Sequence, residues 1–419
     1  MNIHERIFKA NQQAVAYLFQ AEPQWMGVQK AIDCIDGFSE NTILHSGPPI
    51  EYKDMCELHK RGMINAVLFE GYAQTEQEAE ALILSKKIKI DSALNYDTVG
   101  SGTGIVTKSV PLLVVQDKNT LKKACVFPHE GKFGGGFCGW GVYSEEIRNN
   151  LHAMQTELFA HINVLLKEIG GLPLKDIITG GLEMGDENHS SQTAVDALFI
   201  RKIIPLALQC ENASELLQYF TSSQRFFHNF GQASFRSAIL SANDIPYSSM
   251  VTAAGGNGIQ YGIKVAGLDG WFTAPSPMIR GKYMVEGANE SDQLPWIGDS
   301  SIVECFGLGG LSSAASPKVC SFRNQTPQDG IALTNTMYNI CIGENDSFKI
   351  PQMNYRGAPA GIDIIKVYKT GILPVINGGM INRNGGWLGA GCARIPFECF
   401  DKAVRAYEKK YKVSVNDIC

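Results

Sequence analysis

The sequence lacks three features that would assign it to a common class of protein. Its 419 residues contain no apolar run near the ~18 residues that span a bilayer, no block of basic residues and no C-x-x-C pair. A formal net charge of -5 without such a block argues against nucleic acid and against an acidic membrane surface as partners. The 11 cysteines are odd in number and scattered, and the N-terminus has no signal character. These features predict reduced thiols, a cytoplasmic protein and no structural zinc.

Dinucleotide-binding and repeat signatures are missing as well. The fingerprint G-x-G-x-x-G does not follow the first predicted strand, and Pro48 and Pro49 occupy the turn whose backbone donors would hold a pyrophosphate. We therefore exclude NAD and predict no cofactor. No internal repeat or low-complexity segment organises the chain. Glycine, in contrast, is abundant: 43 residues, about 10% against a usual ~7%, predict frequent turns and close backbone contacts.

Length and changes of pattern along the chain predict an α/β multidomain protein. Residues 5–19 have helical spacing, and from residue 246 short strand-like runs with many glycines replace the long helical patterns. The predicted segments are a docking helix region at 1–40, a Rossmann-like domain at 41–143, a central helical domain at 144–243 and a glycine-rich α+β domain at 244–419.

Four apolar runs alternate with helical or glycine-rich connections in the second segment. The runs cover residues 42–44, 63–69, 88–94 and 110–115, and helical composition covers 51–61 and 75–86. This alternation is typical of a parallel sheet with right-handed crossovers, hence the Rossmann-like prediction.

Polar residues follow these predicted strands, where ligands bind in parallel sheets. His45, Ser46 and Gly47 follow the first strand, and Glu70 and Gly71 follow the second. We predict that His45 and Glu70 act as acid or base and that the other three bind ligand. The alternative for His45 is a loop histidine that only forms hydrogen bonds.

A polar, glycine-punctuated segment at 178–190 joins two predicted helices. Asp186 and Glu187 lie where the second of these helices should begin, so they either cap it and complement its dipole or belong to a catalytic site. The first helix is predicted from Ser144 to the glycines at 170–171. Phe226, Phe227 and other phenylalanines nearby are predicted to be core, because no basic residues are interleaved with them.

Three glycine-rich loops in the last segment are candidates for binding small anions. Successive backbone N–H groups in such loops form nests for carboxylate or phosphate oxygens, although glycine turns also occur without a ligand. Cys305 beside one of them is predicted to be a buried structural thiol. The candidate ligand-binding residues are Asn257, Gly258, Gly298, Asp299, Ser300, Gly309, Gly310, Gly389 and Gly391. We predict that His45, Glu70, Asp186 and the 298–300 turn converge on one cleft.

Several of these loops together resemble one family, the bacterial YlbE/YahG-like proteins, whose member AllG is a subunit of an oxamate carbamoyltransferase. The matching stretches run in order through most of the chain: Leu44–Ile50, Phe69–Ala73, Met184–His189, Asn257–Gly258 with Tyr261–Ile263, Trp271–Pro275, Ile297–Ser300, Gly357–Asp363, and Gly389–Gly391 with Pro396–Phe400.

The resemblance implies a role in purine or allantoin catabolism. A carbamoyl group would move from oxalurate to phosphate, giving oxamate and carbamoyl phosphate, in a complex with an FdrA-type subunit; we also expect a homo-oligomer. Two alternatives stay open. The chain is a non-catalytic, small-anion-binding or regulatory partner of that subunit, or it acts on a small carboxylate with a divalent metal held by Asp186, Glu187 and Asp299.

Overall fold

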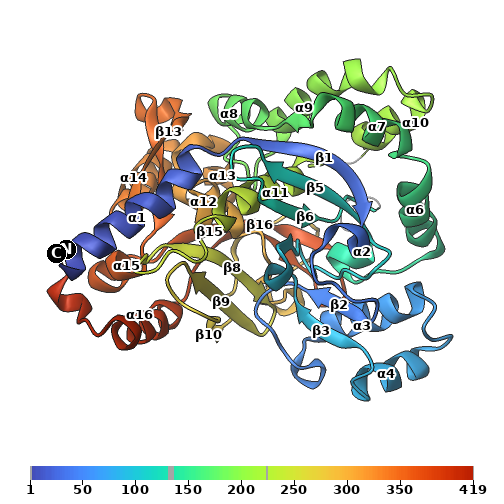
Figure 1. Ribbon diagram of the computed structural model, residues 1–419, viewed down its shortest axis with the longest axis horizontal. Coiled ribbons are helices and arrows are strands. Elements are labelled where there is room, and N and C mark those ends of the chain that lie inside the picture. Colours follow the sequence, from blue (N-terminus) through green and yellow to red (C-terminus); the bar gives the residue numbers. More distant parts are fainter. Residues whose placement is uncertain (1, 131–135, 223–224, 419) are drawn as a thin grey trace.

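The structure, a computed structural model, describes residues 2–130, 136–222 and 225–418. A curved mixed sheet, below helices α8 and α9 in the upper half of the view in Figure 1, organises the first half of the chain. Its neighbouring strands are antiparallel except for the parallel pair β4 and β6. The strands, in order across the sheet, are β4 (Thr98–Val99), β6 (Lys123–Val126), β5 (Pro111–Asp117), β1 (Pro23–Lys30) and β7 (Leu172–Pro173).

Both faces of this sheet are buried, which explains the continuous apolar run of β5. Leu113 and Val115 belong to one hydrophobic core, whereas Leu112 and Val114 belong to another. Successive side chains of a strand point to opposite faces, so a strand that separates two cores is apolar at every position.

Helices cover the two faces. Helix α11 lies against β1, β5 and β6, and its phenylalanines fill the core as predicted. In the described ranges, no helix has the length and apolar character needed to cross a membrane. The helices of this half are α1 (Ile3–Phe19), α2 (Ala31–Cys34), α5 (Phe137–Trp140), α6 (Glu145–Thr156), α7 (Ala160–Ile169), α8 (Lys175–Glu183), α9 (Thr193–Ala207), α10 (Ala213–Ser222) and α11 (Phe227–Leu240).

A separate βαβ unit packs beside the sheet, in blue at the lower right of Figure 1. Strands β2 (Thr42–His45) and β3 (Lys89–Ser92) are parallel, and α3 (Glu57–Phe69) and α4 (Glu76–Leu84) connect them. The chain is therefore a mixed α/β protein, and one parallel crossover of the predicted kind exists.

The Rossmann-like sheet predicted for 41–143 is wrong beyond that unit. Residues 63–69 are the second half of α3, not a strand, because Met63, Ala66 and Val67 bury one helical face. A short apolar run does not distinguish a buried helix from a strand. The predicted fourth strand exists as β5, but it pairs antiparallel with β1 and β6.

The first and third predicted segments contribute to the same structure. Strand β1, which was not predicted, lies between β5 and β7, and one continuous core includes residues from 7 to 418. The helix predicted for 144–169 begins with Ser144 as its N-cap but is interrupted at 157–159, giving α6 and α7. The four segment boundaries stay predictions.

The second half is α+β. Its sheets are β10-β9-β8-β12, β11-β16-β15 and β13-β14, all antiparallel. The strands are β8 (Val251–Asn257), β9 (Gln260–Val265), β10 (Phe272–Pro275), β11 (Arg280–Tyr283), β12 (Ile297–Gly298), β13 (Cys341–Ile350), β14 (Arg356–Ile362), β15 (Val375–Ile381) and β16 (Trp387–Arg394). The helices are α12 (Ile302–Phe306), α13 (Pro317–Phe322), α14 (Pro327–Tyr338), α15 (Ile364–Thr370) and α16 (Phe397–Tyr411).

The predicted joint at 178–190 is partly helical. Gly180 and Gly181 lie inside α8, and a Cβ on Gly181 would come within 2.1 Å of Val195 in α9. This glycine therefore permits close helix packing. Gly185, with φ of +104°, has a backbone conformation that residues with a Cβ avoid.

Candidate functional site

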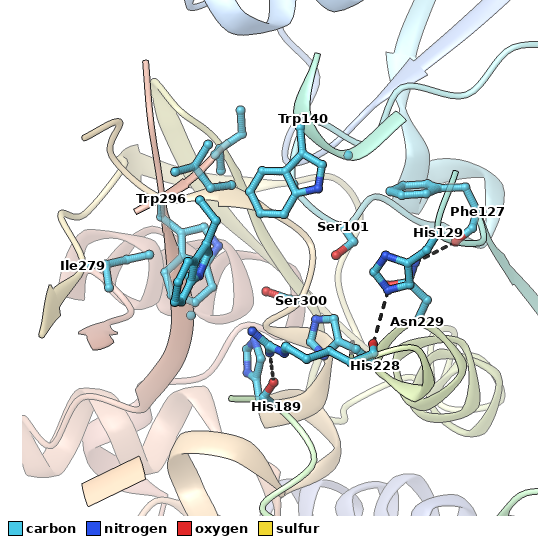
Figure 2. A pocket seen from close by; sticks show the side chains of 18 of the residues that line it. Ser101, Phe127, His129, Trp140, His189, His228, Asn229, Ile279, Trp296 and Ser300 are labelled. Carbon is cyan, nitrogen blue, oxygen red and sulfur yellow. Dashed lines mark hydrogen bonds between the residues drawn. The ribbon is translucent and has the colours of Figure 1, made fainter. Parts of the chain in front are cut away.

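A cavity of about 60 Å³ lies where α11, the 100–104 loop, the 298–300 turn and β15 meet. Figure 2 shows two kinds of wall around it. Its aromatic side chains are Phe127, Trp140, Trp296 and Trp387. Its polar side chains are Ser101, His129, Glu130, His189, Arg225, His228, Asn229 and Ser300. We call this space the inner cavity.

A buried carboxylate orients the imidazole of His189. Glu304 of α12 accepts a hydrogen bond from His189 Nδ1, at 2.8 Å to Oε1. The same oxygen accepts the backbone N–H groups of Gly310, at 2.8 Å, and Asn377, at 3.0 Å. Because a carboxylate held this way acts as acceptor, Nδ1 carries the proton and Nε2 is left as an acceptor. A base oriented by a third group is the usual arrangement for proton transfer.

Arg225 places a positive charge at the inner cavity. Its guanidinium donates to the backbone oxygen of His189, at 2.6 Å, and its own backbone oxygen accepts from His129 Nε2, at 3.2 Å. Burial lowers the pKa of Arg225, while Glu187 and Asp196 raise it. An arginine stays charged under such shifts, so the cavity favours an anion.

His228 supplies a hydrogen-bond donor beside the acceptor of His189. The two rings are stacked, with centroids 5.7 Å apart. The amide nitrogen of Gln192 lies 3.2 Å from His228 Nδ1, so that nitrogen accepts and Nε2 carries the proton. Burial lowers the pKa of His228 well below its usual value, and the imidazole is neutral at pH 7.

Asn229 adds an acceptor to the same wall. Its amide nitrogen donates to the backbone oxygen of Phe127, at 2.7 Å. Its Oδ1 atom is buried and has no hydrogen-bond partner in the described part of the chain. Buried polar atoms are rarely left unpaired, so this oxygen is suited to an N–H group of a ligand.

Glu130 also lines the cavity, and it offsets the positive charge of Arg225 only in part, because its carboxyl group has a raised pKa. Burial raises the pKa of Glu130 to about 7. Hydrogen bonds from the N–H groups of Cys138 and Gly139 act in the opposite direction but are weaker than the effect of burial. Its Oε1 atom accepts the N–H of Cys138 at 2.8 Å, which holds the short helix α5 and Trp140 against the cavity. Burial also lowers the pKa of His129 to about 4.

The first predicted loop lies next to this cavity without lining it. Asp299 accepts the N–H groups of Gly47, at 2.7 Å, and Gly100, at 2.9 Å. We call this contact the Asp299 junction. His45 is buried there, 5.5 Å from the ring of His59, and burial lowers its pKa to about 3. Ser46 Oγ lies 3.4 Å from Nε2 of His59.

Glu70 and Gly71 are not brought to either place. The carboxylate of Glu70 accepts the N–H of Ser109 at 2.9 Å, the hydroxyl of Ser109 at 2.9 Å and the hydroxyl of Thr107. It ties the end of α3 to the 107–109 turn. Gly71 follows that helix end with φ of +71°.

Asp186 and Glu187 hold backbone at the start of α9. Asp186 accepts the N–H groups of Ala194 and Val195 in the first helical turn, although the N-cap position is Gln192. Glu187 accepts the N–H groups of Ser190 and Ser191. The capping alternative therefore describes their contacts. Their catalytic role stays a prediction, as does that of His45 and Glu70.

The predicted cleft is thus only partly assembled. Of its described members, Ser300 lines the inner cavity and Asp299 joins the neighbouring loops, whereas Glu70 and Asp186 face other partners. The geometry gives no support to the proposed metal ligands Asp186, Glu187 and Asp299, because each carboxylate is bonded to different N–H groups. Among the described residues, no three His, Cys, Asp or Glu side chains are placed to share an ion.

The glycine-rich loops mainly serve the protein's own backbone, and their role as nests for small anions stays a prediction. Gly310 donates to Glu304, and Gly309 donates to the backbone oxygen of Glu187. Gly389 and Gly391 instead permit close pairing, since a Cβ would lie 2.1 and 2.2 Å from strand β11. Asn257 and Gly298 belong to the paired strands β8 and β12, and Gly258, with φ of +81°, follows β8. Cys305 is buried as predicted, and burial raises its pKa.

Most residues that line the inner cavity were not among the predicted site residues. Arg225, His228 and Asn229 lie next to or among phenylalanines that were predicted to be core, and His129 was not singled out. His189 stands in a motif that the resemblance rests on, yet only its acidic neighbours were selected. An arginine and a histidine among phenylalanines at 225–235 are the signal that was present.

Comparisons with known proteins place this geometry among related chains. A family model described as oxamate carbamoyltransferase subunit AllG matches residues 88–300. The uncharacterized protein YahG of Escherichia coli (strain K12) is 32% identical, covering 98% of this chain and 88% of that protein. The oxamate carbamoyltransferase subunit AllG of the same strain is 31% identical, covering 96% and 97%.

A solved structure has the same fold. The crystal structure of a conserved protein of unknown function from Enterococcus faecalis V583 superposes with a TM-score of 0.92 at 28% identity, covering 97% of this chain and 99% of that chain. The architecture described above is therefore shared over nearly the whole length.

Proposed function

Because the chain belongs to the family that contains YahG and AllG, we propose that it is a subunit of a carbamoyltransferase-like complex of purine or allantoin catabolism. The reaction moves a carbamoyl group between oxamate and phosphate. The inner cavity is its substrate site, and an FdrA-type subunit is its partner. The observation that carries the proposal is one small cavity that combines Arg225, the oriented imidazole of His189 and the unpaired oxygen of Asn229.

The size and polarity of the cavity support a small ureido or amide carboxylate. About 60 Å³ is far below the ~300 to 1,000 Å³ of most ligand pockets, so nucleotides and long side chains do not fit. The positive charge of Arg225 suits a carboxylate, and Oδ1 of Asn229 suits an amide N–H. Trp140 and Trp296 provide flat apolar surfaces for a planar group.

The proton balance of the reaction requires one group that both accepts and donates. When hydrogen phosphate attacks the ureido carbonyl of oxalurate, it loses one proton, and the C–N bond that breaks leaves a nitrogen that must gain one. His189, whose Nε2 atom is an acceptor, takes the first proton and returns it to the departing nitrogen. His228 donates to the oxygen that becomes negative in between.

An activity assay distinguishes this proposal from the alternative that the chain is a non-catalytic partner. The pure chain, alone and mixed with its FdrA-type partner, is incubated with oxalurate and phosphate, and carbamoyl phosphate is measured. Product from the mixture alone supports a subunit role, and product from the chain alone makes it the catalyst. If neither preparation forms product, and oxalurate, oxamate and carbamoyl phosphate leave the melting temperature unchanged, the proposal is wrong.

A pair of variants tests the place of the substrate. Asn229→Ala removes the unpaired acceptor and should weaken binding of oxamate about tenfold, which corresponds to ~1.4 kcal/mol. Asn119→Ala, in an exposed turn that contacts Gln20, is the matched control and should bind normally. Equal affinity of both variants would remove the inner cavity as the site.

A further inference from the structure

A second, larger cavity adjoins the inner one. Its volume is about 540 Å³, and α9, α13, the end of β11 and β16 form its walls. Arg225 and Trp387 line both cavities, so these two side chains form the partition between them. We call the larger space the outer cavity.

The outer cavity combines two cations from separate elements. Arg225 precedes α11, and Lys318 of α13 lies with its Nζ atom 3.4 Å from the hydroxyl of Thr193. The lysine is exposed, so a ligand beside it keeps part of its hydration. Ser190 adds a second hydroxyl.

The acidic lining residue has its carboxylate turned to the backbone. Asp196 accepts the N–H of Arg225 at 2.9 Å and the N–H of Phe227 at 2.8 Å, one on each oxygen. Burial raises its pKa to about 6. Both carboxylate oxygens are thus bonded to backbone N–H groups, and the charge of Asp196 raises the pKa of Arg225, which keeps that guanidinium protonated beside Lys318.

The N-terminus of α9 is not the source of attraction. Asp186 already takes the N–H groups of Ala194 and Val195, so the helix dipole meets the protein's own carboxylate. An anion in the outer cavity must therefore rely on the side chains of Lys318 and Arg225.

We propose that the outer cavity is an oxyanion subsite, in which Lys318 and Arg225 bind phosphate or the phosphate end of an acyl phosphate beside the inner cavity. A hydrated dianion loses less solvation in 540 Å³ at an exposed lysine than in 60 Å³ among tryptophans. Arg225 then contacts both ligands, at the place where their reacting atoms meet. The choice of phosphate rests on the proposed function; the preference for an oxyanion rests on the two cations.

Direct binding of inorganic phosphate to the full chain tests this subsite without any turnover. Calorimetry in phosphate-free buffer is run on the wild type, Lys318→Gln and a matched control, Lys349→Gln, which removes an exposed lysine of β13. We expect Lys318→Gln to weaken phosphate binding about fivefold to tenfold and to leave oxamate binding unchanged. Lys349→Gln should change neither.

A variant of Arg225 provides the second part of the binding experiment. Arg225→Lys, checked for folding by its melting temperature, should weaken both phosphate and oxamate, because the residue is shared. Unchanged phosphate affinity in Lys318→Gln, or an equal loss in Lys349→Gln, overturns the subsite. If phosphate binding depends on Lys318 but oxalurate and phosphate give no carbamoyl phosphate in any mixture, the subsite stands and the proposed reaction fails.

Discussion

The Asp299 junction and the inner cavity share the 100–104 loop and the 298–300 turn, but their polar groups have different partners. At the junction, the carboxylate of Asp299 receives an N–H group on each oxygen. At the cavity, the imidazole of His189 is bonded on one nitrogen by Glu304, and the ring also lines the cavity.

The difference separates structural polar groups from reactive ones. A carboxylate that accepts a buried backbone N–H on each oxygen fixes the approach of two loops. An imidazole held on one side keeps one nitrogen for chemistry. Glu304 is a structural carboxylate, because it accepts the N–H groups of Gly310 and Asn377. It also orients the reactive imidazole of His189.

The largest expected effect is on turnover, when the imidazole of His189 is replaced. His189→Gln keeps a donor for Glu304 but removes the titratable nitrogen, so kcat for carbamoyl transfer should fall about 10²- to 10⁴-fold, with oxamate affinity nearly unchanged. Steady-state kinetics of the complex measure it. His161→Gln, with a side chain 42% exposed, is the control and should retain activity. A loss below about threefold would show that His189 does not move the proton.

The next effect is on stability, when the junction loses its acceptor. Asp299→Ala leaves the N–H groups of Gly47 and Gly100 buried without a partner, which costs about 1 to 3 kcal/mol each. Urea denaturation should show a free energy of unfolding lower by about 2 to 6 kcal/mol. Asp269→Ala, whose side chain is 97% exposed and pairs with Lys410, should change it by less than ~1 kcal/mol. Equal costs would contradict the structural role of the junction.

The sequence predicted elements where local pattern decides the outcome. The strand at 42–45, the helix at 76–84 and the N-cap Ser144 follow from spacing and capping chemistry. It did not predict β1, nor that β5 would pair antiparallel, because pairing partners far apart in the chain are set by tertiary packing. The helix at 63–69 buries Met63, Ala66 and Val67 against neighbouring elements that include α4, α5 and β2, and the run itself does not encode these contacts.

For the site, the sequence predicted loops next to the inner cavity, such as the 298–300 turn, but not the side chains of His189, Arg225 and His228. Glycine clusters predicted backbone N–H groups that bind anions, but whether such a group meets a ligand or an internal carboxylate, as at Gly310, depends on the fold. Arg225 and His228 stand among phenylalanines, where an apolar pattern predicts core. Only the folded chain brings them to the same cavity as His189.

The pH dependence of stability tests the structural role of Asp299 at the junction, because burial raises the pKa of this side chain to about 7. An unfolded Asp has a pKa of ~3.9, so the stabilisation from protonated Asp299 is complete below that value and is lost as pH rises through about 7. Asp299→Asn lacks this term. Its stability relative to wild type should therefore rise by about 1 to 3 kcal/mol between pH 5 and pH 8 in urea titrations. A difference that stays flat, or an equal slope for Asp269→Asn, would contradict the shifted pKa.

The smallest expected effect concerns Glu70, a carboxylate that the sequence favoured as acid or base but that contacts Thr107 and Ser109 outside the inner cavity. Glu70→Gln keeps one oxygen acceptor for the turn and removes the charge, so stability should fall by about 1 kcal/mol. Because no step of the proposed reaction passes through this side chain, kcat/KM of the complex should stay within about twofold, a difference of ~0.4 kcal/mol. Kinetics and urea denaturation are measured on the same preparation, so that a loss of folded protein is not read as a loss of catalysis. A fall in kcat of a hundredfold with normal stability would return Glu70 to the reaction and place the active site at the end of α3 rather than at His189.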